Sequence, residues 1–545
     1  MGVRVVGLRV WWILSLLSVA SLAVAATSDL RLLVAVKNQD KEAVRTLLKE
    51  HVDVNATQGD GATALQWAVE RNDLETAELL LHSGANVNAA NDYGVTALSL
   101  ACANRNDSLV EKLLKVGAKP NLAQVTGETP LMTCARTGSL EGVKSLLAGG
   151  ANANAKESER GQTALMWAAA QKHPDVTQAL VDHGADVHAK SATLPLFTPT
   201  FPVTYSVSAH VPKTKGGFTP LMFAAQSGDA DSARILLAAG ANVNDSTPED
   251  GTALVVAAVN GQEKVALLLI EKGADPNAKD AYGLTALHWA LQEGIKTLYG
   301  RPADNDRFWE HPNMPELVKS LLVHGADPNA RMAKDFLPYN IHRFARNRGN
   351  DLPQVGMTGA TPLLLAAAAG DYGMMRVLVE GKADPKMSTV EGLTPLLAAA
   401  GVGCERNERG GAGAAGGGGG GEDISEELQQ KTLEAVKLAV RLGDDVNAIG
   451  PGGRTALHGA ALWGETEVIK FLAENGANLE AKDMYGETPL TIALGDPGQL
   501  VFRQLPNLDF DYTFRNPRSH KKAADLLVKL GAAPYNGPVA DRSGQ

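Results

Sequence analysis

The side chains that could bind a metal ion are scattered along this sequence rather than grouped. His183 and His188 come nearest to a metal site, since they lie five residues apart with Asp182 and Asp186 beside them. Imidazole and carboxylate groups bind zinc, but a zinc site needs three or four ligands at characteristic spacings. This group matches those spacings only loosely, so we expect neither a bound metal nor a cofactor.

The motifs that mark catalytic centres are also missing. The sequence has no G-x-S-x-G, H-E-x-x-H, C-x-x-C, haem-attachment or phosphate-loop motif. It does contain G-x-G-x-x-G at Gly411, Gly413 and Gly416, but a dinucleotide-binding fingerprint follows a strand and opens a helix. Here the polar run 405–409 precedes it, and 410–421 is almost pure glycine and alanine, which predicts a flexible tether. We therefore do not expect an enzyme.

The first 25 residues have the composition of a secretory signal. Arg4 and Arg9 precede an apolar run over 10–22, and Ala-Val-Ala at 23–25 has the A-x-A pattern of a cleavage site. We predict a signal peptide over 1–25 and export to the periplasm or the medium, with an uncleaved membrane anchor as the alternative. No later stretch approaches 18 apolar residues, so we expect no stable membrane insertion once the signal is removed.

The charge balance argues against nucleic acid as a partner. The formal net charge is −10, and it becomes −12 when the two arginines of the signal are removed. Binding to a phosphate backbone needs a basic face. The mature chain is acidic as a whole, so we expect a protein partner and no nucleic acid.

One phrase, T-A-L or T-P-L, recurs along the chain and predicts its architecture. Six of the ten steps between successive threonines are 33 residues long and one is 34. Gly-Ala follows most of these threonines after 21 residues. The threonines are Thr63, Thr96, Thr129, Thr163, Thr219, Thr252, Thr285, Thr361, Thr394, Thr455 and Thr488. This period, with T-P-L-H-x-A and G-A-D-x-N as its two halves, resembles that of ankyrin repeat proteins.

Each repeat predicts a pair of helices. Threonine is a good N-cap worth about 1 kcal/mol, and we expect Thr252, in a central repeat, to act in this way. An apolar stripe at helical spacing, such as Ala77, Leu80 and Leu81, predicts the second helix. The resemblance implies an all-α solenoid of about twelve repeats over 26–535, joined by β-turn fingers and followed by a tail over 536–545. A signal ahead of such an array resembles the exported ankyrin proteins of bacteria.

Five insertions interrupt the period. Those at about 191–216 and 332–357 lengthen fingers, whereas those at 295–315, 401–427 and 495–519 lengthen the turn between two helices. The resemblance implies that these two places lie at opposite edges of the stack, with the fingers along its concave side. Long loops in compact domains are usually functional or disordered, and the aromatic residues in four insertions argue against disorder. Binding to a partner and packing against the insertion's own repeat both stay open.

We predict that binding residues lie on the long fingers and in the groove. Four aromatic residues share one repeat position, four residues after the threonine: Trp67, Trp167, Phe223 and Trp289. The resemblance implies that this position faces the groove, where aromatic anchors dominate interface energies. The first long finger carries Phe197, Phe201 and Tyr205, and the second carries Phe336, Tyr339, Arg343, Phe344 and Arg346. Semi-buried packing is the alternative role for the four groove aromatics.

The remaining notable side chains are expected to be structural. Cys102 and Cys134 stand where most repeats carry alanine, so we expect small buried hydrophobes, with a bridge between the neighbouring repeats in an oxidising compartment as the alternative. His288 and His458 match the histidine of T-P-L-H, which forms local hydrogen bonds within the stack. We conclude that the chain is an exported, non-enzymatic scaffold that binds protein. The alternative is an enzyme, or an enzyme subunit, whose site is built from the insertions.

Overall fold

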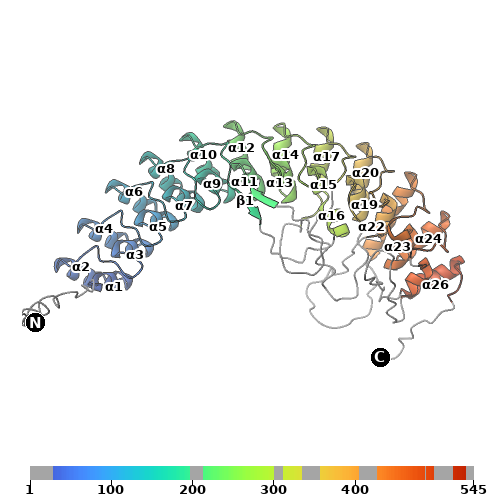
Figure 1. Ribbon diagram of the computed structural model, residues 1–545, viewed down its shortest axis with the longest axis horizontal. Coiled ribbons are helices and arrows are strands. Elements are labelled where there is room, and N and C mark those ends of the chain that lie inside the picture. The colour runs from blue at the N-terminus through green and yellow to red at the C-terminus, as the bar shows by residue number, and fades with distance from the viewer. Residues whose placement is uncertain are drawn as a thin grey trace, which may run out of the picture. The chain divides into compact units, whose positions relative to one another are not determined.

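The computed structural model describes residues 29–196, 213–299, 311–333, 356–403, 426–484, 486–495 and 520–535. The chain divides into two compact units, Met1–Trp167 with Asp182–Ala185, and Ala168–Val181 with Asp186–Gln545. In each unit, pairs of antiparallel helices stack along the chain, with the first helices in one layer and the second helices in another (Figure 1). The described residues contain twelve such pairs, as the period predicts.

The helices of unit 1 follow the repeat closely. The first helices are α1 (Arg31–Lys37), α3 (Ala64–Glu70), α5 (Ala97–Ala103) and α7 (Pro130–Thr137). The second helices are α2 (Lys41–Lys49), α4 (Leu74–His82), α6 (Asp107–Lys115) and α8 (Leu140–Ala148). The next pair, α9 (Ala164–Ala170) and α10 (Pro174–Asp182), contributes residues to both units.

Unit 2 contains seven further pairs. Its first helices are α11 (Pro220–Ser227), α13 (Ala253–Val259), α15 (Ala286–Trp289), α19 (Pro362–Ala368), α21 (Pro395–Ala399), α23 (Ala456–Trp463) and α25 (Pro489–Leu494). Its second helices are α12 (Ala230–Ala238), α14 (Glu263–Glu271), α17 (Pro315–Val323), α20 (Tyr372–Glu380), α22 (Glu426–Arg441), α24 (Thr466–Glu474) and α26 (Lys521–Leu530). An additional helix, α16 (Gln292–Tyr299), and a 3-10 turn, η2 (Pro451–Gly453), complete the helical elements described.

The threonine of the repeat phrase caps most first helices, as predicted. The hydroxyl of Thr219 accepts from the backbone N–H of Met222, three residues on, and Pro220 occupies the first helical position. In two repeats the consensus histidine completes the cap, because Nδ1 of His288 and of His458 accepts from the backbone N–H of the threonine three residues before it. Burial lowers the pKa of His288 to about 4, which keeps this ring neutral and able to accept.

Thr252 is an exception, and the cap predicted for it is absent. Its hydroxyl is buried and makes no hydrogen bond, although its backbone pairs with the preceding finger through β3 (Ser246–Thr247) and β4 (Gly251–Thr252). A buried hydroxyl without a partner stabilises a fold less than a capping one.

Adjacent repeats are joined by asparagine side chains that lie between the second helix and the finger. The Asn88 amide donates to the backbone oxygen of Gly117, 29 residues on, and its oxygen accepts from the backbone N–H of Lys119. The same pair of bonds joins Asn277 to Gly325 and Asp327 in unit 2. We call this series the asparagine ladder; its amide bonds start at Asn55, Asn88, Asn121, Asn154, Asn244, Asn277, Asn329 and Asn447.

The insertions begin and end on ordered parts of the repeats. Strands β1 (Thr193–Leu196) and β2 (Lys213–Gly216) form an antiparallel pair at the base of the 191–216 finger. The ends of the 332–357 finger are tied together, since Gly359 donates to the backbone oxygen of Met332 and Met332 donates to that of Ala360. The 401–427 and 495–519 insertions fall mostly outside the described residues, as do the 1–25 signal and the 536–545 tail.

The 295–315 insertion differs from the expected loop, because it begins within a helix. Ile295 and Leu298 of α16 are buried, and α16 packs on α19, the first helix of the next repeat. The approach is close: a Cβ on Gly294 would lie 2.1 Å from the backbone oxygen of Leu365. This part of the insertion therefore packs on the array itself.

The two cysteines of unit 1 also differ from expectation. Cys102 and Cys134 are buried, as predicted, but they form a disulfide with a Cα–Cα distance of 4.6 Å. The prediction of two free thiols is therefore wrong. Sequence position placed both side chains correctly in the first helix but did not show that they face each other across two repeats.

We predict that two threonine variants differ in stability. Thr219→Ala removes a capping hydrogen bond and should lower the free energy of unfolding by about 1 kcal/mol. Thr252→Ala removes a hydroxyl that has no hydrogen-bond partner, so its cost should be clearly smaller. Urea titration of the two purified variants measures both changes, and a larger cost at Thr252 would contradict the assignment of the caps.

Candidate interaction surface

The tips of successive fingers are joined by backbone hydrogen bonds, along all the tips described in unit 1 and between several neighbouring pairs of tips in unit 2. In unit 1, Asp92 donates its backbone N–H to the backbone oxygen of Asp60, and Val125 donates to Tyr93, at 2.9 and 3.0 Å. In unit 2, Val390 donates in the same way to Thr358. These backbone bonds fix neighbouring tips in register, so side chains at the tips are held before any partner binds.

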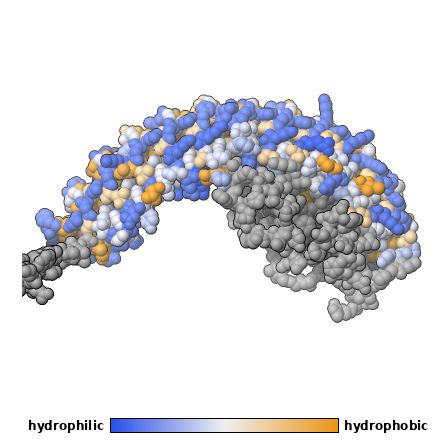
Figure 2. Space-filling view, viewed as in Figure 1, coloured by the Kyte–Doolittle hydropathy of each residue, from blue (hydrophilic) through white to orange (hydrophobic). Residues whose placement is uncertain are grey.

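Several tips carry exposed apolar side chains. In unit 1, Tyr93 and Val125 lie on successive tips and are 63% and 68% exposed. In unit 2, Val390 and Ile449 are 74% and 73% exposed, and Met484, on the following tip, is more than half exposed. We call these two sets the unit 1 tips and the unit 2 tips. Hydrophobic surface elsewhere on the visible face occurs as small patches among hydrophilic residues (Figure 2).

Two of the predicted groove aromatics lie beneath cations of the preceding repeat. The Nζ of Lys37 lies 4.1 Å from the ring centroid of Trp67, and the guanidinium of Arg136 lies 5.1 Å from that of Trp167. A cation over an indole face is attracted by the ring quadrupole. In both cases the cation lies in the last turn of a repeat's first helix, and the tryptophan lies in the first turn of the first helix of the following repeat. Both rings are half-buried, and neither Nε1 has a hydrogen-bond partner.

The other two groove aromatics are held by neighbours within unit 2. Phe223 contacts Phe218 edge to face, with ring centroids 5.6 Å apart. Trp289 is buried, and its Nε1 donates to a carboxylate oxygen of Asp280 at 2.9 Å. Its ring is thus part of the packing of the finger and is closed to a partner in this conformation.

Asp280 organises the finger that leads into α15. Its other carboxylate oxygen accepts from the backbone N–H groups of Tyr282 and Leu284. Burial raises the pKa of Asp280 to about 6, and the nearby Asp250 adds to this, whereas the three hydrogen bonds oppose it. The finger is therefore built around a carboxyl group that titrates in mildly acidic solution.

Most of the predicted finger residues lie outside the described part of the chain. This applies to Phe197, Phe201, Tyr205, Phe336, Tyr339, Arg343, Phe344 and Arg346. Their role in binding stays a prediction. The exposed tips, in contrast, were missed by the sequence analysis, although a tyrosine or aliphatic residue just before the turn glycine, as at Tyr93, is a signal that could have found them.

Metal-binding clusters and membrane-spanning helices are both absent from the described residues. No group of three or more His, Cys, Asp or Glu side chains there lies close enough to hold a metal ion. None of the helices in these parts of the chain is long and apolar enough to span a membrane.

Comparison with known proteins gives a consistent result. A family model described as ankyrin repeats in three copies matches residues 32–124, 98–191, 203–280, 245–307 and 427–511. A second model, of the single ankyrin repeat, matches 282–333 and 358–389. Together these matches cover well over half of the chain.

Individual relatives are similar over shorter stretches. The ankyrin repeat and SAM domain-containing protein 6 of Danio rerio is 29% identical over 178 residues, which are 30% of this chain and 21% of the relative. The neurogenic locus notch homolog protein 1 of Xenopus tropicalis is 28% identical over 51% of this chain and 8% of its own length. The chain thus spans less than a quarter of these two relatives.

A solved structure, the human ASB11 ankyrin repeat domain, matches with 25% identity and a TM-score of 0.37. The match covers 45% of this chain and 98% of that domain.

The buried carboxyl group predicts a pH effect on stability. Because the pKa of Asp280 is raised above its unfolded value of 3.8, the folded state holds this proton more tightly. The contribution of Asp280 to the free energy of unfolding is therefore present at low pH and is lost as the pH rises through about 6. The loss is roughly 3 kcal/mol, since each pKa unit corresponds to about 1.36 kcal/mol. The difference in unfolding free energy between wild type and Asp280→Asn should therefore fall between pH 4 and pH 6.

Asp60, a half-buried fingertip carboxylate of unit 1, provides the matched control. Hydrogen bonds from Ala62 and Gln58 lower the pKa of Asp60, so its charged form is favoured in the folded state. Asp60→Asn should show no such fall over the same pH range. Urea titrations at three pH values suffice, and a pH-independent difference for Asp280→Asn would show that the carboxyl group is already ionised at pH 4.

Proposed function

Because this chain belongs to the ankyrin repeat proteins, we propose that it is an exported, non-enzymatic scaffold that binds another protein through its fingertips, long fingers and groove. Ankyrin repeats generally mediate protein–protein interaction. The observation that carries the proposal is the pair of apolar tip sets, which are exposed and held in register by backbone hydrogen bonds. An exposed apolar side chain on a fixed backbone contributes to binding without the cost of ordering a loop.

The tips complement the long fingers in this proposal. Rows of exposed apolar residues rimmed by polar ones are typical of protein interaction sites. The 191–216 and 332–357 fingers, with their aromatic and arginine side chains, extend from the same edge as the tips, since both are finger segments of the repeat. Trp67 and Trp167 of unit 1 and Phe223 of unit 2, which are half-buried, would each add to the surface of their own unit. No observation among the described residues favours the alternative of an enzyme.

Export is the second part of the proposal, and two features support it. The basic start, apolar run and A-x-A pattern of residues 1–25 are those of a secretory signal. The Cys102–Cys134 disulfide is of a kind that persists in oxidising compartments and is rare in the cytosol of mesophiles. We place the mature chain in the periplasm or outside the cell.

We expect the mature protein to begin near Ala26. N-terminal sequencing of the protein recovered from its native cells measures this directly, and fractionation of the same cells shows whether it leaves the cytoplasm. An intact Met1 on material that stays with the membrane would contradict the cleavage.

Partner binding should depend on the unit 2 tips. We predict that the V390S/I449S/M484S variant captures at least tenfold less partner than wild type does. Burying each of these side chains contributes about 1.5–3 kcal/mol to binding, and about 1.4 kcal/mol corresponds to a tenfold change in affinity. The measurement is quantitative mass spectrometry of proteins captured from an extract of the native cells. Thermal unfolding of the variant should be unchanged, since the three side chains are solvent-exposed.

Val323→Ser is the matched control for this experiment. Val323 is at least as exposed as the tip residues, but it is the last residue of a second helix and does not lie on a fingertip. Its substitution should leave capture unchanged. Equal capture by the tip variant and by wild type would remove the unit 2 tips from the binding surface.

A further inference from the structure

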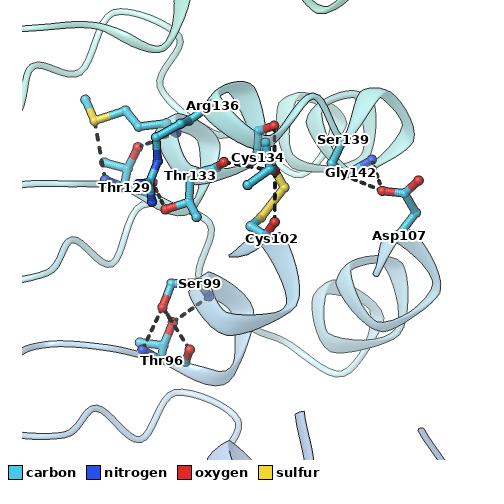
Figure 3. The surroundings of a disulfide bond; sticks show 12 residues. Thr96, Ser99, Cys102, Asp107, Thr129, Thr133, Cys134, Arg136, Ser139 and Gly142 are labelled. Atoms are coloured by element: carbon cyan, nitrogen blue, oxygen red, sulfur yellow. Dashed lines mark hydrogen bonds between the residues drawn. A yellow bond between two sulfur atoms is a disulfide. The ribbon is translucent and has the colours of Figure 1, made fainter. Parts of the chain in front are cut away.

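The disulfide of unit 1 joins the first helices of two consecutive repeats. Cys102 lies near the end of α5 and Cys134 in the middle of α7, and both side chains are fully buried (Figure 3). Helices α5 and α7 pack directly on each other, as do α6 and α8 of the same repeats. The bond therefore bridges the interface that holds the third repeat to the fourth.

The other repeats of the same chain show that packing alone does not require these cysteines. Cys134 stands five residues after its threonine, and in all ten other repeats with the threonine phrase this position is alanine. Cys102 stands six residues after its threonine, where seven of the other repeats carry alanine. The alanines that match Cys134 are Ala68, Ala101, Ala168, Ala224, Ala257, Ala290, Ala366, Ala399, Ala460 and Ala493. Two neighbouring repeats thus depart from the pattern at the two positions that face each other.

A third departure provides room for the sulfur. A Cβ on Gly142, in α8, would lie 2.9 Å from the Sγ of Cys134, and Figure 3 shows the two residues side by side. The matching residue of every other second helix, eight positions before the positive-φ residue that follows the helix, has a side chain. These residues are Ala43, Thr76, Leu109, Val176, Ser232, Val265, Leu317, Met374, Ala435, Val468 and Ala523. The glycine therefore accompanies Cys134 in the same repeat, where the absence of a side chain leaves room for the sulfur and for the hydroxyl of Ser139.

The same glycine supports a second bond across the interface. The backbone N–H of Gly142 donates to a carboxylate oxygen of Asp107 at 3.1 Å, and the hydroxyl of Ser139 donates to the same oxygen. Asp107 belongs to α6, so the side chain of one repeat satisfies the free N–H at the start of the next repeat's second helix. The disulfide thus lies in an interface that is already well ordered.

We propose that Cys102 and Cys134 are a redox-sensitive staple that couples the third and fourth repeats of unit 1. Stacking of the repeats brings the thiols together. The two thiols then lose two protons and two electrons to a small-molecule disulfide, whose S–S bond is reduced to two thiols as the Cys102–Cys134 bond forms. In a repeat array, stability is the sum of repeat and interface contributions, so this interface is a place where the stack can open.

The disulfide stabilises the closed interface mainly by restricting the chain when the interface is open. It closes a loop across a sequence separation of 32 residues, which restricts the chain once the helices part. Chain entropy then predicts that oxidation lowers the opening equilibrium of this interface on the order of 10²–10³-fold. Both sulfurs are buried, so a reductant reaches them only when the interface opens, and reduction should be slow in the folded protein.

The test uses the full chain, oxidised with glutathione disulfide or reduced with dithiothreitol, and hydrogen exchange of the peptides that cover α5 to α8. Reduction should speed exchange of these amides by 10²–10³-fold. C102A/C134A places the usual alanine of the repeat at both positions, so we expect this variant to fold. Its α5 to α8 amides should exchange as fast as those of the reduced protein, and dithiothreitol should not change their rate. Peptides of α23 and α24, in unit 2, should not respond in any sample.

Thiol counting after denaturation supplies an independent measurement. In Cys404→Ser, which leaves only Cys102 and Cys134, the oxidised protein should show no free thiol and the reduced protein two. Two results would each overturn the proposal: two free thiols in Cys404→Ser after treatment with glutathione disulfide, or equal exchange of α5 to α8 in the oxidised and reduced protein. Exchange in C102A/C134A as slow as in the oxidised wild type would also overturn it, since the interface would then need no staple.

Discussion

The structure depends on contact between neighbouring repeats, because a single helix pair cannot bury its own apolar face. Ala101 of α5 and Leu109 and Leu113 of α6 are fully buried, and these two helices pack on α7 and α8 of the next repeat as well as on each other. Small residues in the first helix allow close packing of one repeat on the next. The threonine caps, the asparagine ladder and the tip-to-tip bonds all act on this contact, either by shaping each helix pair or by fixing its register.

This dependence explains which parts of the fold could be predicted from the sequence. The start of a first helix is decided locally, by a threonine hydroxyl that caps it, and this cap was predicted correctly at Thr219. The Cys102–Cys134 bond is a contact between repeats, so its residues are 32 positions apart and no local pattern marks them. Comparing matched positions among the repeats would have found it, since Cys134 and Gly142 depart from the pattern together.

The candidate site shows the same division between local and neighbouring influence. Repeat position predicted that Trp67 and Trp289 would occupy the same face, but not that one would lie half-buried under Lys37 and the other would be buried against Asp280. The residues that decide the difference are Lys37, from the preceding repeat, and Asp280, from the finger of the same repeat. Helix α16 was missed for a related reason: its apolar residues meet α19, which lies beyond the long finger.

The asparagine ladder continues across the insertions. Asn277 reaches Gly325 over 48 residues and Asn329 reaches Lys382 over 53, where an uninterrupted repeat needs 29. The frame therefore keeps its register whatever length of chain leaves it and returns. Related proteins can therefore exchange, lengthen or lose loops without changing the stack. The loops that meet partners can then diverge at a different rate from the repeats that keep the chain folded.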